Sequence, residues 1–160
     1  MGEKEGFVRG IASGGRTIDQ ATFDARVERA AAGLDALGVG QGDCVAILMR
    51  NDIAFLEASY AAIRLGAYAV PINWHFHPEE IAYILRDCAA KVLITQADLL
   101  ETARKAASPG LTVFVAPTPD TIAQAFSIAP ERCQLPADAQ SWDDFIATNA
   151  PSAGAARPQT

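Results

Sequence analysis

Short apolar runs alternate with longer segments of helical periodicity along most of this chain. The runs cover residues 44–49, 68–72, 91–95 and 111–115, and each has the length of a buried strand. Between them, apolar side chains recur every three or four residues, which is the spacing of one helical face. This alternation predicts an α/β fold: an open, mostly parallel sheet with helices on both faces.

Capping residues mark where the first two helices begin and end. Asp19 is a good N-cap for a first helix, whose apolar face is formed by Phe23, Val27, Ala30, Leu34 and Leu37. We expect Asn51 to cap a second helix, which ends at Gly66 and turns Ile63 inward. These boundaries leave only short connections to the neighbouring strands.

The pattern continues more weakly toward the C-terminus. Pro78 suits the first turn of a third helix, and a fourth helix runs to about Ala107. The segment 116–140 contains four prolines, which exclude long regular elements. We expect only a short helix at 121–126 and a capped helical turn at 141–146.

The chain is expected to form one α/β unit with a short tail. Residues 1–15 are polar and rich in glycine, which predicts a mobile arm or a short edge element. Residues 149–160 are mostly Ala, Pro, Ser, Gly and Thr, a composition typical of a linker or frayed terminus. We therefore place the α/β unit at residues 1–148.

Charge and composition exclude several classes of partner. The net charge is −6, the pI is about 4.8 and no Lys/Arg run occurs, which disfavours nucleic acid and anionic membranes. No apolar segment approaches the ~20 residues that span a bilayer, and the N-terminal residues contain no secretory signal. Cys44, Cys88 and Cys133 are odd in number and far apart, which predicts reduced thiols in a cytoplasmic protein.

Four segments, in their order and spacing, resemble a known family. They are Thr17–Phe23, Leu37–Asp43, Leu65–Asn73 and Pro78–Ile94. Together they are similar to the N-terminal part of the adenylate-forming, AMP-binding superfamily of acyl-CoA synthetases. The chain departs from the family pattern at Thr22, where an acidic residue usually completes a capping box.

The resemblance implies an activity for a full-length parent. Such a ligase converts a carboxylate, ATP and coenzyme A to acyl-CoA, AMP and pyrophosphate, as in fatty acid metabolism, and it uses Mg. The family's phosphate-binding loop and late catalytic Lys have no counterpart in these 160 residues. The nearest imitation of the loop, Ser13–Arg16, is interpreted as a turn. We therefore expect this chain alone to be inactive, to bind none of these cofactors and to have the rest of the ligase as its partner.

His75 is the candidate cofactor-binding residue, and no catalytic residue or metal ligand is predicted. It follows a strand's C-terminal end, where parallel sheets bind ligands, and the resemblance implies a contact with the nucleotide end of coenzyme A. A structural role in the loop is the alternative for both His75 and His77. Trp74 is either an exposed aromatic residue or a lid, and Glu79, Glu80 and Asp87 are interpreted as a solvated helix face.

A second class of function stays open. The chain could be a non-enzymatic, flavodoxin-like module that binds a ligand or a protein. The segment after the first core strand, Met49–Asp52, lacks the Ser/Thr-rich loop of a flavodoxin, which argues against this alternative. In either case, an exposed apolar face could support self-association.

Overall fold

The computed structural model describes residues 9–151 and contains a five-stranded sheet in the order β4-β3-β5-β6-β7. All neighbouring strands in this sheet are parallel. The strands are β3 (Cys44–Leu48), β4 (Tyr68–Pro71), β5 (Val92–Gln96), β6 (Thr112–Ala116) and β7 (Gln140–Ser141). The predicted parallel α/β fold is therefore confirmed.

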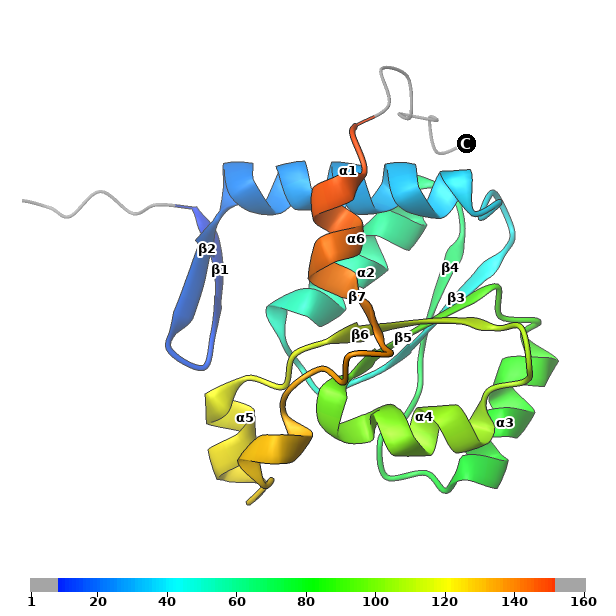
Figure 1. Ribbon diagram of the computed structural model, residues 1–160. Coiled ribbons are helices and arrows are strands. Elements are labelled where there is room, and N and C mark those ends of the chain that lie inside the picture. The colour runs from blue at the N-terminus through cyan, green and yellow to red at the C-terminus, as the bar shows by residue number, and fades with distance from the viewer. Residues whose placement is uncertain (1–8, 152–160) are drawn as a thin grey trace, which may run out of the picture.

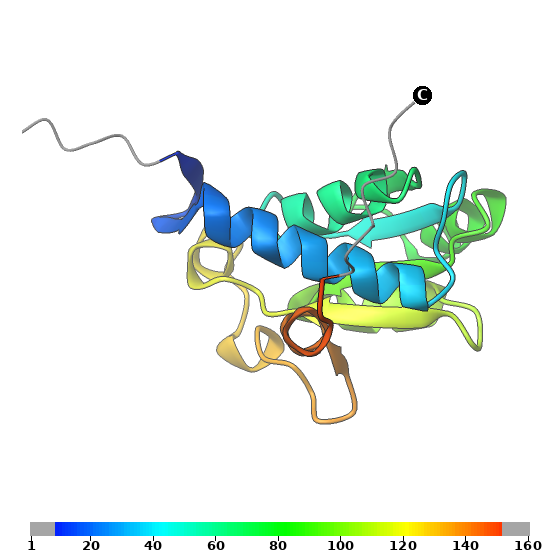
Figure 2. The ribbon, with the colours of Figure 1, turned by 90° about the horizontal axis from the view of Figure 1, so that it is seen from above.

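Helices cover both faces of the sheet (Figure 1). One face carries α1 (Gln20–Ala36), α2 (Ile53–Arg64) and α6 (Trp142–Thr148). The other carries α3 (Pro78–Asp87) and α4 (Leu100–Ala106), which follows a 3₁₀ turn at Ala97–Leu99. Seen from above, α6 lies beside α1 and over β6, in agreement with its contacts (Figure 2). The remaining helical elements are α5 (Asp120–Ala125) and a 3₁₀ turn at Pro130–Arg132.

Alternate residues of β3 supply the two halves of the core. Val45 and Ile47 belong to the cluster beneath α1, α2 and α6, which also contains Trp142. Ala46 and Leu48 belong to the cluster beneath α3 and α4. Burial of each large apolar side chain stabilises the fold by roughly 1.5–3 kcal/mol, so both helical layers are held mainly by apolar packing.

The first helix is capped as the sequence predicts, but the second is not. The Asp19 carboxylate accepts hydrogen bonds from Thr22 N at 2.9 Å and from Thr22 Oγ1 at 2.8 Å. For α2, the prediction of Asn51 is wrong: Asp52 is the N-cap, and its side chain makes no capping bond. The Asp52 carboxylate is instead paired with Arg16, which ties α2 to the N-terminal hairpin.

That hairpin consists of β1 (Gly10–Ser13) and β2 (Arg16–Asp19), which pair antiparallel and stand apart from the main sheet (Figure 1). Gly14 and Gly15 have φ values of +55° and +77°, which glycine adopts readily. The predicted turn at Ser13–Arg16 is thus confirmed. The predicted arm at 1–15 and tail at 149–160 lie partly outside the described residues.

Two further differences concern exposure. Leu37 is 47% exposed and Ile63 is 42% exposed, although the helical spacing predicts that both face inward. Leu37 is the C-cap residue of α1, and Ile63 lies on the outer side of α2, since its neighbours Ala61 and Ala62 are the buried residues of that turn. Within residues 9–151, no helix combines the length and apolar character that a membrane crossing requires.

Candidate functional site

The sheet has a topological switch point between β3 and β5. After β3 the chain passes through α2 to β4 on one side, and it then crosses to β5 on the other side of β3. The connections that leave β3 and β5 therefore run to opposite faces of the sheet. Open α/β sheets bind ligands at the carboxyl ends of the strands beside such a point, so this edge is the candidate site.

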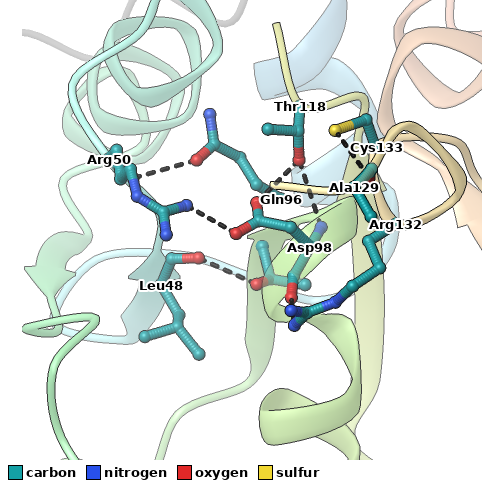
Figure 3. A network of polar contacts seen from close by, with 9 residues as sticks. Leu48, Arg50, Gln96, Asp98, Thr118, Ala129, Arg132 and Cys133 are labelled. Atoms are coloured by element: carbon teal, nitrogen blue, oxygen red, sulfur yellow. Dashed lines mark hydrogen bonds and ion pairs between the residues drawn. The ribbon is translucent and has the colours of Figure 1, made fainter. Parts of the chain in front are cut away.

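Arg50 occupies this edge, two residues after the end of β3. Its backbone N–H donates to Gln96 Oε1 at 3.1 Å, and its Nη1 donates to Asp98 Oδ2 at 2.7 Å (Figure 3). Arg50 is 9% exposed and Asp98 is 4% exposed. A buried ion pair thus joins the segments that follow β3 and β5.

Asp98 is also bonded to the segment that follows β6. The Thr118 hydroxyl donates to Asp98 Oδ1 at 2.7 Å and accepts from the Asp98 backbone N–H at 3.1 Å (Figure 3). Arg132 Nη2 donates to the Asp98 backbone carbonyl at 2.9 Å. Through one carboxylate, the ends of three adjacent strands are held in fixed relative positions.

Two aromatic rings lie close to the Arg50 guanidinium. Its Cζ is 4.3 Å from the ring centroid of Trp74 and 4.6 Å from that of Phe126. The two rings meet edge to face at 5.1 Å. Cation–π contacts contribute roughly 0.5–2 kcal/mol each, so Trp74 stabilises the buried cation. Trp74 is thus partly buried rather than an exposed aromatic residue, and its role as a lid stays a prediction.

Two buried polar atoms at this edge have no hydrogen-bond partner among the described residues. They are Arg50 Nε and Gln96 Nε2. A buried donor without a partner costs about 1–3 kcal/mol. The edge therefore retains hydrogen-bonding capacity that the chain itself does not use.

The structure places His75 at the same edge but outside the buried pair. Its side chain is exposed, and its ring stacks on Trp74 with a centroid separation of 3.5 Å. Its backbone N–H donates to Asn73 Oδ1 at 3.0 Å, which fixes the turn after β4. His75 is thus linked to Arg50 through Trp74, and its contact with coenzyme A stays a prediction.

The other polar residues near this edge belong to α3, where they cap the helix or face solvent. His77 is the N-cap residue of α3, and its backbone N–H donates to Glu80 Oε2 at 2.8 Å. Glu79, Glu80 and Asp87 are exposed, as predicted for a solvated face. Over the part of the chain that the structure describes, no group of three or more His, Cys, Asp or Glu side chains could hold a metal ion.

A second polar feature lies beside the switch point, in a cleft of about 620 Å³ between the hairpin, α2 and the end of β6. Arg26 pairs there with Glu57 and, at 2.7 Å, with Asp143. Glu57 is 2% exposed. Burial raises the pKa of its carboxyl, and Arg26 opposes that rise only in part. Through its two ion pairs, the Arg26 guanidinium joins α1 to α2 and α6.

Sequence reasoning missed most of the network around Arg50. Gln96 and Asp98 follow directly after an apolar run, and no motif marks them as site residues. Thr118 lies in a proline-rich segment without periodicity. A usable signal exists: Arg50, Asp98 and Thr118 each follow a strand's C-terminal end by two residues. Nothing in the sequence indicates that Phe126, on a separate helix, reaches Arg50.

The family model of the AMP-binding enzymes matches residues 3–151 of this chain. A long-chain-fatty-acid–CoA ligase, FadD13 of Mycobacterium tuberculosis, is 41% identical over 96 residues, covering 58% of this chain and 19% of the ligase. A 3-hydroxybenzoate–CoA ligase of Aromatoleum sp. is 30% identical over 139 residues, covering 76% of this chain and 26% of the ligase.

Solved structures agree on the fold. A benzoate CoA ligase from Burkholderia xenovorans LB400 superposes with a TM-score of 0.74 at 22% identity, over 96% of this chain and 28% of that protein. The chain spans between 19% and 26% of the length of the two curated relatives named above. The chain therefore belongs to the AMP-binding enzyme family and corresponds to the N-terminal part of its acyl-CoA ligases.

Proposed function

We propose that this chain is the N-terminal α/β unit of an ATP-dependent acyl-CoA ligase. The complete enzyme joins a carboxylate to AMP with release of pyrophosphate, and it then transfers the acyl group to the thiol of coenzyme A. The observation that supports this proposal best is the family match across residues 3–151. Adenylation is chemically useful because it gives the carboxylate a good leaving group.

The contribution of this unit is a rigid edge on which the coenzyme rests. The Arg50–Asp98 pair fixes the ends of β3 and β5, and Trp74 packs on Arg50. His75 stacks on Trp74 and is exposed, so its imidazole is available to a phosphate of coenzyme A. A protonated imidazole would strengthen that hydrogen bond.

The remaining assignments concern the complete ligase. ATP, Mg and coenzyme A are its cofactors, and the rest of the ligase is the partner of this unit. The three free cysteines support a cytoplasmic location. The relatives' names include both fatty acids and benzoates, so the proposal extends to carboxylic acids as a class.

Pyrophosphate–ATP exchange tests the assignment of activity. We expect exchange from the complete ligase with at least one member of a panel of fatty and aromatic carboxylic acids. The isolated chain should give no exchange above a buffer blank, because it is proposed to contribute neither the phosphate loop nor the catalytic Lys. Exchange by the purified isolated chain would overturn the proposed division of roles.

The role of His75 is tested in the complete ligase by His75→Ala, with His77→Ala as the matched control. We expect His75→Ala to weaken coenzyme A use in the thioester step about 5-fold, equivalent to about 1 kcal/mol. Adenylation should be unchanged. Equal kinetics for coenzyme A in both variants, or a parallel loss of adenylation, would return His75 to a structural role.

A further inference from the structure

Two cysteines far apart in the sequence lie in the same layer of the fold. Cys44 is the first residue of β3 and shares its side of the sheet with Ala46 and Leu48, since side chains alternate along a strand. Cys88 is the C-cap of α3. It lies four residues after Ile84 and three after Leu85, on the helical face that packs against that same side.

The backbone brings the two positions together. Lys91 N–H donates to the Cys44 carbonyl at 3.0 Å, so the chain joins β3 only three residues after Cys88. Ala89, with φ of +49°, reverses the chain between α3 and β5. The neighbouring Lys91–Asp43 ion pair, at 2.9 Å, holds the same turn. The end of α3 is thereby fixed against the start of β3.

The two thiols are neighbours, and solvent reaches both. Each is free and partly exposed. The Cys88 thiol donates a weak hydrogen bond to the Leu85 carbonyl, with Sγ and O 3.8 Å apart. Burial raises the pKa of this thiol, and the nearby Cys44 thiol raises it further. Cys133, the third cysteine, is buried and bonded to the Ala129 carbonyl at 3.5 Å. Cys44 and Cys88 therefore form a distinct pair.

We propose that Cys44 and Cys88 form a dithiol modification site, which closes to an intramolecular disulfide when the protein meets a small-molecule disulfide such as oxidised glutathione. The thiolate of one cysteine attacks the glutathione disulfide and releases one reduced glutathione. The other cysteine then attacks the protein sulfur of the mixed disulfide and releases the second. Both protein thiols are oxidised, and one glutathione disulfide is reduced to two thiols that carry the two protons.

The location of Cys44 and Cys88 determines how a disulfide between them would affect the protein. Both cysteines lie at the amino ends of the strands, whereas Arg50 and His75 follow the carboxyl ends. The link would close a loop that contains β3, α2, β4 and α3. It would restrict the unfolded chain and stabilise the folded one, while the candidate ligand edge keeps its geometry.

The test uses the whole chain carrying Cys133→Ser, so that only the proposed pair remains. The protein is equilibrated with a mixture of oxidised and reduced glutathione, and the reaction is quenched with acid. The free thiols are then alkylated, and the mass of the protein is measured by mass spectrometry. We expect a loss of two hydrogens, no glutathione adduct, and a peptide that joins Cys44 to Cys88. The yield should exceed that of the guanidinium-denatured chain by about tenfold or more, because folding raises the effective concentration of the thiols.

Single-thiol variants and wild type make the result decisive. With Cys133→Ser as background, Cys44→Ser or Cys88→Ser should accumulate the mixed disulfide with glutathione. If Cys133→Ser does not fold by circular dichroism, peptide mapping of wild type answers the same question. Stable glutathione adducts without the 44–88 link, a link to Cys133, or equal yields from folded and denatured chains would overturn the proposal.

Discussion

The Arg50 guanidinium and the Asp98 carboxylate are 2.7 Å apart and are both almost fully buried at the switch point of the sheet. Taking two charges out of water costs several kcal/mol per ion, and their attraction offsets this cost only when the remaining bonds are also made. Here Thr118 supplies a further bond to Asp98. The pair fixes geometry at this edge more than it adds stability.

Removing one partner should therefore cost much more than removing both. We expect Asp98→Ala to lower the free energy of unfolding by about 3–5 kcal/mol, since it leaves a buried cation without its counterion. The double variant Arg50→Met/Asp98→Leu should recover part of that loss. Urea unfolding followed by circular dichroism measures both.

A control for this prediction is the ion pair between Lys105 and Glu101, at 2.8 Å, whose side chains are both largely exposed. Lys105→Ala should change stability very little, because exposed pairs are screened by water. A loss for Asp98→Ala no larger than that of Lys105→Ala would contradict the buried-pair interpretation.

Glu57 should make stability depend on pH. Its pKa is raised above the usual value of 4.5, mainly by burial, so the folded state binds more protons than the unfolded state in that range. The stability that protonated Glu57 contributes is present below pH 4.5 and is lost as pH rises through the higher folded pKa. Glu57→Gln should abolish this dependence, so wild type should lose stability relative to the variant as pH rises.

Glu101 provides a control of opposite sign. Lys105 lowers the pKa of its carboxyl, first through a hydrogen bond, so its contribution is present above the usual pKa and is lost as pH falls. Denaturant midpoints measured between acidic and neutral pH should diverge from wild type in opposite directions for Glu57→Gln and Glu101→Gln, and the divergence for Glu101→Gln should be small because its ion pair is exposed. The same trend in both variants would refute the assignment for Glu57.

Gly33 of α1 faces the side chains of Phe145 and Asn149 at α6. An added Cβ would overlap the ring of Phe145 and come within 2.8 Å of Asn149 Nδ2. Alanine normally stabilises a helix relative to glycine. We nevertheless expect Gly33→Ala to destabilise the protein by about 1–3 kcal/mol, because the Phe145 ring, which packs against Phe114 and Trp142, must be displaced. Chemical unfolding measures the change.

Ala25 is an exposed residue of the same helix, so a substitution there measures the effect of helix propensity without a change in packing. Ala25→Gly should cost roughly 1 kcal/mol. If Gly33→Ala instead stabilised the protein by a similar amount, the predicted destabilisation by the contact with Phe145 would be wrong.

Exposed apolar side chains should give the chain a measurable surface signature. Leu37, Tyr60, Ile63 and Tyr68 are each more than 40% exposed. We expect the isolated chain to bind a hydrophobic dye or to self-associate in light scattering, since large apolar patches are normally covered. A strictly monomeric protein without dye binding would contradict this, and Tyr68→Ser should reduce either signal.

Local pattern in the sequence was sufficient to predict the main strands and helices. Each of β3, β5 and β6 lies within about one residue of its predicted run. By contrast, β7 consists of Gln140 and Ser141 alone, and its pairing with β6 depends on tertiary contacts. The cap at Asp52 was also missed, because its carboxylate is paired with Arg16 in a distant hairpin.

The candidate site was only partly predictable for the same reason. His75 was placed correctly after β4, since a strand's end follows from its apolar run. The bond between Thr118 and Asp98 depends on the register of β5 and β6, in which Gln96 pairs with Ala116. No local signal encodes that register, so the network around Arg50 emerges only when the strands are assembled.

Trp142 has a consequence for the order in which the chain can fold. It is fully buried beneath α1 and α2, in a cluster otherwise built mostly from residues more than 25 positions earlier. During synthesis, the ribosome releases α1 long before α6, so this half of the core stays incomplete until nearly the last described residue has emerged. Such distant contacts slow folding and leave apolar surface transiently exposed. The nascent chain should therefore depend on chaperones until α6 arrives.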